Sequence, residues 1–221
     1  MDDNSLITIQ DLHFSYRNGK RVFEGIHFCL KKDEKIGLIG PNGAGKTTLF
    51  HLIMGLLSPS SGSIEIFNKI RKEESDFREV RQKIGLLFQD SDDQLFCPTV
   101  EEDIAFGPLN LGKSHHEVSL IVRETCRKLG LSGYEKRITH RLSGGEKRLV
   151  ALATIMAMKP TCYLLDEPTT GLDDKASKRF LDYLREHADT YVMISHNHDV
   201  LRNAVEKVYE LTDGILRAVG G

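Results

Sequence analysis

The chain has 221 residues, of which 40% are apolar and 28% are charged. This length corresponds to one large domain, or to a core with a small lobe, and it is sufficient to bury a hydrophobic core. Lys and Arg number 30 and Asp and Glu number 32, so the formal net charge is -2, which argues against a dedicated nucleic-acid-binding protein. The four cysteines form no Cys-x-x-Cys pair, as expected of a reduced, cytosolic chain without structural zinc.

No segment of the sequence is predicted to cross a membrane. The most apolar stretch, residues 149–158, is about half the ~20 residues that a spanning helix requires. The first five residues are acidic and polar, unlike a secretory signal. We therefore expect that other chains would carry this protein to a membrane, if it works there.

The first elements in chain order are strands. Residues 6–10 and 22–30 are rich in β-forming side chains, and Asn18-Gly19 between them is a strong hairpin signal. The chain is therefore expected to start with an antiparallel pair. The next expected elements are strands at residues 35–39, 63–67 and 84–88 and a helix at residues 47–57.

The second half alternates helices with strands. Thr99 with Glu102, and Ser114 with Glu117, form capping-box patterns that start two helices, and a glycine follows the second helix after Leu129. Further helices are expected at residues 143–158 and 173–187, and strands at residues 161–165, 190–194 and 205–211. This alternation predicts a mainly parallel sheet, and the helix-rich middle, about residues 90–158, predicts a lobe.

A glycine-rich segment lies between the expected strand at residues 35–39 and the helix that follows. It reads Gly40-Pro41-Asn42-Gly43-Ala44-Gly45-Lys46-Thr47-Thr48 and fits the pattern G-x-x-x-x-G-K-[ST]. The glycines let successive N–H groups face one anion, and the helix N-terminus favours phosphate. Lys46 is expected to reach the β- and γ-phosphates and Thr47 to hold Mg²⁺. The alternative is a glycine-rich turn with a surface lysine.

Two carboxylates, Asp166 and Glu167, end an apolar strand. Acids at the carboxyl end of a buried parallel strand lie where ligands bind. Asp166 is expected to support Mg²⁺ and Glu167 to act as general base towards the attacking water. The alternative is an exposed acid pair at a helix start, which the upstream phosphate loop makes the minor reading.

A third motif reads Leu142-Ser143-Gly144-Gly145-Glu146. Ser143 and Glu146 have capping-box spacing, so a plain helix N-cap is one interpretation. The other is an anion site built from the Ser143 hydroxyl, the two glycine N–H groups and the helix dipole.

Together these motifs resemble the nucleotide-binding ATPase of ATP-binding-cassette (ABC) proteins over essentially the whole chain. Six family motifs occur in the family's order: the phosphate loop, glutamine loop, signature, Walker-B strand with its glutamate, D-loop and switch histidine. Here they correspond to residues 40–47, Gln89, residues 142–146, residues 162–167, residues 171–173 and His196.

The resemblance implies an α/β fold. It consists of a P-loop NTPase RecA-like core, an N-terminal antiparallel β subdomain and an inserted helical subdomain, within a single ABC ATPase domain over residues 1–221. The implied activity is ATP hydrolysis with Mg²⁺, and the implied catalytic residues are Glu167, His196 and Lys46. The implied metal ligands are Thr47, Gln89 and Asp166.

The resemblance also implies contacts with the nucleotide. Tyr16 would stack on adenine, although an aromatic that packs on the sheet is the alternative. Gln89 would touch Mg²⁺ or water and report the γ-phosphate, which His196 would contact while orienting Glu167. The signature residues Ser143, Gly144 and Gly145 would meet ATP on the other subunit, and Asp173 would act across the subunit interface.

The segment after Gln89 resembles energy-coupling-factor importer ATPases of the cobalt/nickel type. The distinguishing features are Gln94 and the Ala-Phe-Gly-Pro-Leu-Asn run at residues 105–110. Leu95 and Phe96 are expected to help form a groove for amphipathic coupling helices of a membrane partner, or alternatively to anchor a loop in the core. The departures from the family pattern are Glu146 in place of a commoner Gln, Gly171 in place of Ala, and Ser91 in place of a frequent Pro.

The implied partners are a second ABC ATPase subunit, identical or different, a transmembrane coupling subunit and a membrane substrate-binding subunit. Nucleic acid is not expected. The implied location is the cytoplasmic face of the cell membrane, and the solute is cobalt or nickel, with a vitamin such as biotin as the alternative. Because the chain ends soon after the last strand, without the C-terminal dimerisation region of many relatives, no stable nucleotide-free dimer is expected.

Three other functions remain as alternatives. The first is the ATPase of another ABC transporter. The second is a non-transport ABC protein of DNA repair or translation, which usually carries a long coiled-coil insertion or two cassettes. A small GTPase or kinase is the third, but Asn68-Lys69-Ile70-Arg71 lacks the Asp of a guanine-reading Asn-Lys-x-Asp motif.

Overall fold

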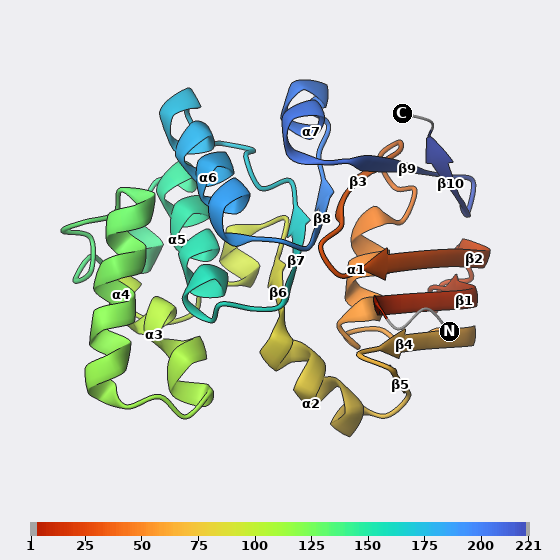
Figure 1. Cartoon of the computed structure of the whole chain (residues 1–221), viewed down its shortest axis with the longest axis horizontal. Helices are drawn as coiled ribbons and strands as arrows, with labels where there is room; N and C mark the ends of the chain where they lie inside the picture. Colours follow the sequence, from red (N-terminus) through yellow and green to blue (C-terminus); the bar gives the residue numbers. More distant parts are fainter. Residues whose placement is uncertain (1–3, 220–221) are drawn as a thin grey trace. The chain divides into compact units, whose positions relative to one another are not determined.

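The computed structural model describes residues 4–219, which Figure 1 colours from red at the N-terminus to blue at the C-terminus. The chain divides into two compact units. The first unit runs up to Ile84 and resumes at Asp189, and the middle unit is Gly85–Ala188. The expected helical subdomain, at about residues 90–158, lies within the middle unit, whereas a single domain over the whole chain stays a prediction.

One sheet of the first unit is antiparallel throughout. In spatial order it contains β2 (Arg21–Lys31), β1 (Ser5–Ser15), β4 (Ser61–Ile66) and β5 (Lys69–Ile70). The turn between β1 and β2 is closed by a hydrogen bond of 2.9 Å from the Tyr16 N–H to the Lys20 carbonyl. The antiparallel start that Asn18-Gly19 predicted is therefore confirmed.

The other strands of the first unit are mainly parallel. In spatial order they are β10 (Ile215–Val219), β9 (Lys207–Thr212), β3 (Lys35–Ile39) and β8 (Tyr191–Ile194). β3 pairs in parallel with β8 and β9, whereas β10 is antiparallel to β9. Because the carboxyl ends of parallel strands meet at one edge, the loops that follow β3 and β8 lie at the same edge of this sheet.

In its described residues, 4–84 and 189–219, the first unit contains the helices α1 (Lys46–Ile53), α2 (Glu74–Lys83) and α7 (His198–Ala204). The expected helix at residues 47–57 ends early, because Gly55 has a φ of 66°, a left-handed conformation typical of helix ends. The sequence patterns did not predict α2, α7, β5 or β10. In α2 only Phe77 and Val80 are buried, so its apolar periodicity is weak.

The middle unit contains most of the helices. Its elements are β6 (Ile84–Leu87, which starts at the unit boundary), α3 (Val100–Asn110), α4 (His115–Leu129), α5 (Gly144–Ala157), β7 (Cys162–Asp166), α6 (Asp174–His187) and the 3₁₀ turns η1 (Ser91–Asp93) and η2 (Thr139–Arg141). The helix α5 contacts both α3 and α4, beside which it lies in Figure 1. Thr99 and Ser114 form the predicted capping boxes. Between residues 4 and 219, no helix is both long and apolar enough to span a membrane.

Candidate functional site

The glycine-rich loop joins β3 to α1, as its sequence predicted. Gly45 is the N-cap of α1 with a φ of 106°, and a Cβ there would collide with the Val22 side chain. A Cβ at Gly40, whose φ is 141°, would collide with the carbonyl oxygen of Leu211. Both positions therefore require glycine, because the backbone is left-handed and closely approached by neighbouring strands.

The Lys46 side chain lies across this loop. Its ammonium donates hydrogen bonds to the carbonyls of Gly40 at 2.7 Å and Pro41 at 3.0 Å, and the residue is 8% exposed. The first turn of α1 contains no acidic residue. A buried cation beside a helix N-terminus favours an anion such as phosphate.

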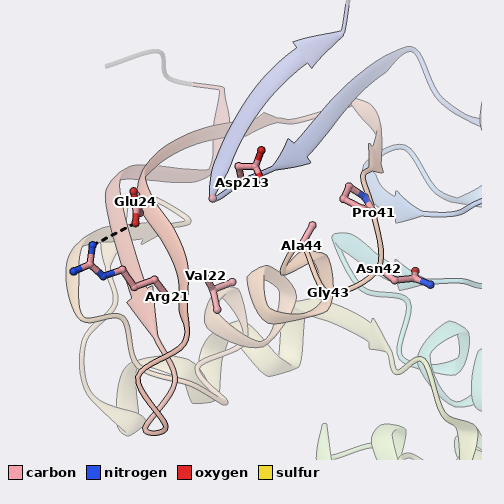
Figure 2. A pocket seen from close by; sticks show the side chains of 9 residues that line it. Arg21, Val22, Glu24, Pro41, Asn42, Gly43, Ala44 and Asp213 are labelled. Carbon is pink, nitrogen blue, oxygen red and sulfur yellow. Dashed lines mark ion pairs between the residues drawn. The ribbon is translucent and has the colours of Figure 1, made fainter.

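A cavity of 280 Å³ opens beside the loop. Figure 2 shows its walls, with the loop from Pro41 to Ala44 on one side, Val22 on β2 and Asp213 in the turn between β9 and β10. It is lined by Arg21, Val22, Glu24, Pro41, Asn42, Gly43, Ala44, Asp213 and Gly214. Because drug-sized sites usually occupy about 300–1,000 Å³, this cavity suits part of a nucleotide.

Tyr16 lies next to the start of α1. Its hydroxyl is 2.7 Å from the Thr48 Oγ1, and its ring packs edge-on against Phe14 with centroids 5.0 Å apart. The side chain is still 38% exposed, so part of it is accessible. Tyr16 is not among the residues that line the cavity beside the loop.

His196 follows β8 in the first unit and is exposed, whereas Ser195 before it is buried. Because β3 and β8 run in parallel, with Leu38 opposite Ile194, His196 and the phosphate loop leave the sheet at the same edge. The first unit therefore brings Tyr16, residues 40–48 and His196 to one region.

The acidic pair predicted after the strand at residues 161–165 lies at the end of β7. All five residues of β7 are buried, and Asp166 is 2% exposed. Glu167 has a φ of 50°, a left-handed conformation that costs a non-glycine residue about 1–3 kcal/mol and is concentrated at functional sites. The Thr170 hydroxyl donates a hydrogen bond of 3.2 Å to the Glu167 carboxylate.

The signature turn caps α5. Ser143 is the N-cap, and its hydroxyl accepts a hydrogen bond of 3.3 Å from the Glu146 N–H. A Cβ at Gly145 would lie 2.7 Å from the Gly171 carbonyl, so the signature turn closely approaches the D-loop. Asp173, which ends the D-loop, caps α6 by accepting a hydrogen bond of 2.7 Å from Ala176.

The glutamine loop follows β6 and leads into η1. Gln89 is exposed. Gln94 anchors this loop. Its side-chain amide donates hydrogen bonds to the Ala151 carbonyl at 2.9 Å and to the Thr154 hydroxyl at 2.8 Å. It also accepts a hydrogen bond from the Phe88 N–H at 3.2 Å.

Phe96 is 66% exposed and forms an edge-to-face pair with Phe106 on α3, with centroids 4.8 Å apart. Phe96 therefore does not anchor the loop in the core, as the alternative for Leu95 and Phe96 required, whereas Leu95 is half-buried. Leu109, also on α3, is 39% exposed. We call Phe96, Phe106 and Leu109 the α3 apolar patch.

Sequence reasoning assigned no individual role to Arg148 or Asp103, which lie within segments that resemble the importer subgroup. Arg148 on α5 is buried and donates to carbonyls of both the glutamine loop and the end of β7. Asp103 is 3% exposed and accepts a hydrogen bond of 3.0 Å from the Thr139 hydroxyl. The acceptors of Arg148 are backbone atoms, which leave no residue pattern. Arg148 directly precedes the apolar stretch of α5 and follows two other charged residues, so the sequence does not mark it as buried.

Known proteins resemble this chain over nearly its whole length. A family model described as ABC transporter matches residues 23–170. The energy-coupling factor transporter ATP-binding protein EcfA of Methanothermobacter thermautotrophicus is 44% identical over 219 residues, which cover 97% of this chain and 70% of that protein.

Two solved structures share the fold. CbiO1 from Clostridium perfringens, part of the ABC transporter complex CbiONQ, has a TM-score of 0.82 and 31% identity, covering 97% of this chain and 87% of that one. The dimeric bacterial ABC transporter cassette MJ0796 has a TM-score of 0.86 and 26% identity, covering 97% and 99%. The expected P-loop NTPase fold is confirmed, and the chain belongs to the ABC transporter family as an ATP-hydrolysing cassette.

Proposed function

We propose that this chain is the ATPase subunit that powers an energy-coupling-factor importer. The observation that carries the proposal is the phosphate loop, with Lys46 held across it, in a chain that matches an ATPase named EcfA over 97% of its length. The loop and the N-terminus of α1 bind the β- and γ-phosphates. Tyr16 supports the adenine with its aromatic ring, and Thr48 lies beside its hydroxyl.

The chain also offers suitable donors for Mg²⁺. A hydroxyl from Thr47, a side-chain amide oxygen from Gln89 and a carboxylate from Asp166 are the hard oxygen ligands that this ion prefers. When bound, Mg²⁺ would neutralise charge on the β- and γ-phosphates. Burial of Asp166 at the end of β7 gives its carboxylate a fixed place.

Glu167 is the proposed general base. It takes a proton from the water that attacks the γ-phosphorus, and ADP leaves as phosphate forms. Its left-handed backbone and its hydrogen bond from Thr170 hold the carboxylate in one direction. His196 contacts the γ-phosphate and orients Glu167 in this mechanism.

Hydrolysis is proposed to require two cassettes, identical or different. Ser143, Gly144 and Gly145 at the start of α5 present N–H groups and a hydroxyl that suit the γ-phosphate of ATP on the other subunit. Asp173 contributes to the same subunit interface. The dimeric structure of MJ0796 supports this arrangement by similarity.

Membrane subunits are the other proposed partners. The α3 apolar patch, together with Leu95, would receive amphipathic coupling helices of a transmembrane subunit, which would hold the ATPase at the cytoplasmic face. Cobalt or nickel is the proposed solute, on the resemblance of the segment after Gln89, and CbiO1, which is part of the ABC transporter complex CbiONQ, supports a role in a transporter by similarity. A membrane substrate-binding subunit would select the solute, and a vitamin such as biotin is the competing cargo.

The decisive experiment for the ATPase mechanism is Glu167→Gln. Loss of a general base lowers rates by about 10²- to 10⁴-fold, so ATP should still bind while turnover nearly disappears and the ATP-bound dimer accumulates. Asp174→Asn, a change to an exposed acid on α6, is the matched control and should retain turnover. Wild-type turnover in Glu167→Gln would refute the general-base role.

The importer assignment needs a separate experiment. The chain would be co-expressed with the membrane proteins encoded beside its gene, and uptake of radiolabelled Co²⁺, Ni²⁺ and biotin into vesicles would be measured with ATP. Uptake of a metal that Glu167→Gln abolishes supports the proposal. ATP-driven uptake of biotin alone would identify a vitamin importer instead.

A further inference from the structure

Arg148 is a buried cation that connects two separate segments of the middle unit. It lies in the second turn of α5 and is 3% exposed. One terminal nitrogen donates hydrogen bonds to the carbonyls of Phe88 at 2.6 Å and Gln89 at 3.2 Å. The other donates to the carbonyls of Asp166 and Glu167, the latter at 2.6 Å.

The four acceptors belong to the two loops that carry the proposed chemistry. Phe88 and Gln89 begin the glutamine loop after β6, whereas Asp166 ends β7 and Glu167 follows it. A guanidinium suits this task because its planar fork directs several N–H groups at once in fixed directions. A lysine ammonium has three donors on one atom and cannot span all four carbonyls in the same way.

Burying the charge of Arg148 costs free energy of folding, which indicates that this side chain does more than fill space. Its guanidinium is removed from water and is surrounded by backbone carbonyls, and removing a charge from water costs free energy. Its Nε is buried without a hydrogen-bond acceptor. A well-packed apolar side chain would often stabilise such a position as well as a buried charge does.

Other contacts attach the glutamine loop to the same helix. Lys147, the neighbour of Arg148, forms an ion pair of 2.6 Å with Asp92 of η1, and Gln94 bonds to α5 through Ala151 and Thr154. Both of these contacts reach the glutamine loop. Arg148 differs from them because its second nitrogen also holds the backbone of the acidic pair.

We propose that Arg148 is a positioning residue for ATP hydrolysis, which fixes the backbones of Gln89, Asp166 and Glu167 to the signature helix α5 in one geometry. This inference rests on the proposed function of those three residues. The phosphate loop belongs to the other unit and makes its own contacts with Lys46. Loss of Arg148 should therefore impair the chemical step and leave nucleotide affinity largely intact.

The test compares Arg148→Met and Arg148→Lys with wild type in the full-length chain, assembled with its membrane partners where turnover requires them. ATP affinity is measured with a fluorescent ATP analogue, and kcat and KM are measured by phosphate release. For Arg148→Met we expect kcat to fall by about 100-fold, as it does when catalytic groups are misplaced by about 1 Å. Affinity should stay within about threefold of wild type, because an interaction used only in the transition state affects kcat rather than binding. Arg148→Lys should restore part of the lost kcat.

Two control variants separate positioning from general stability. Lys147→Met removes the neighbouring cation and its ion pair with Asp92, and it should leave kcat near the wild-type value. Ile155→Ala removes buried side-chain volume from the same helix and should lower the melting temperature without lowering kcat. If Arg148→Met does not fold, Arg148→Lys is used for the test instead. Its kcat should also fall while its ATP affinity stays near the wild-type value.

The outcomes distinguish this inference from the proposed function. A wild-type chain that hydrolyses no ATP would contradict the proposed function itself. If wild type is active and Arg148→Met, or the folded Arg148→Lys, has an unchanged kcat, the positioning role is wrong. The positioning role is also wrong if Arg148→Met lowers ATP affinity as much as it lowers kcat. It is wrong, too, if Ile155→Ala and Arg148→Met lower the melting temperature equally and also lower kcat equally.

Discussion

Glu146 accepts hydrogen bonds from both the backbone N–H and the hydroxyl of Ser143, at 2.8 and 2.9 Å. These two hydrogen bonds hold the pKa of Glu146 below its usual value, and the one from the Ser143 backbone N–H has the larger effect. The carboxylate is therefore ionised at neutral pH. The signature turn therefore carries an internal anion on the Ser143 hydroxyl, which is one of the donors that would meet a γ-phosphate. The plain N-cap and the anion site are consequently two uses of one geometry.

Glu146→Gln should tighten the ATP-bound dimer. The substitution removes a negative charge beside the proposed phosphate site, while the amide oxygen still accepts from Ser143. Charge interactions near a surface are worth up to about 1 kcal/mol, so the dimer dissociation constant should fall by up to about fivefold. Sedimentation in the Glu167→Gln background measures it. Glu146→Ala removes the charge and the cap together, and a weaker dimer in Glu146→Gln would show that the carboxylate supports association.

Tyr16→Ala should weaken ATP binding, whereas Tyr16→Phe should retain most of it. Aromatic stacking on a base is worth about 1–3 kcal/mol, which corresponds to about a 5- to 150-fold change in dissociation constant. Phenylalanine keeps the ring against Phe14 and loses only the contact between the hydroxyl and Thr48. Titration with a fluorescent ATP analogue distinguishes the two variants. Equal affinity in wild type and Tyr16→Ala would mean that the ring only packs on the sheet.

The double change Leu95→Asp with Phe96→Asp should abolish association with the transmembrane subunit. Two carboxylates would be desolvated by an apolar partner helix, at a cost far above the contact energy gained. Because Phe96 is 66% exposed and Leu95 is only half-buried, neither change replaces a core side chain, and the isolated chain should keep its fold and its ATP affinity. Leu120→Asp, at a 49% exposed position on α4, is the matched control. Unchanged pull-down of the membrane subunit would contradict the proposed groove.

Local motifs made much of the candidate site predictable from the sequence. The strand, glycine loop and helix around Lys46 are consecutive in the chain, so their spacing alone defines the phosphate loop. The acidic pair Asp166-Glu167 and the helix cap at Ser143 are likewise defined by residues that are close together in the sequence. Each depends on a few neighbouring residues, for which patterning and capping preferences are informative.

The parts that could not be predicted depend on contacts between distant segments. Arg148 finds its acceptors 59 and 60 residues upstream and 18 and 19 residues downstream, and all are backbone carbonyls without side-chain identity. The strand β10 is short and mostly exposed, and pairing with β9 sets it in place. Tertiary context decides such elements, and local preference is weak there.

Acid should remove the stabilisation that Glu79 provides. Its carboxylate bonds to Lys83 at 2.8 Å, to Lys69 at 3.0 Å and to the buried Arg71 at 3.1 Å. These bonds, first that of Lys83, lower the pKa of Glu79 from 4.5 to about 2. Because the pKa is lower in the folded chain, the contribution of Glu79 to stability is complete above pH 4.5 and is lost as the pH falls towards 2.

Glu79→Gln should therefore have a lower melting temperature than wild type at pH 7, and this difference should disappear near pH 2. Thermal unfolding followed by circular dichroism measures it, with Glu210→Gln, at an exposed position on β9, as the control. A difference that persists at pH 2 would show that volume or geometry, and not the charge of Glu79, stabilises the cluster.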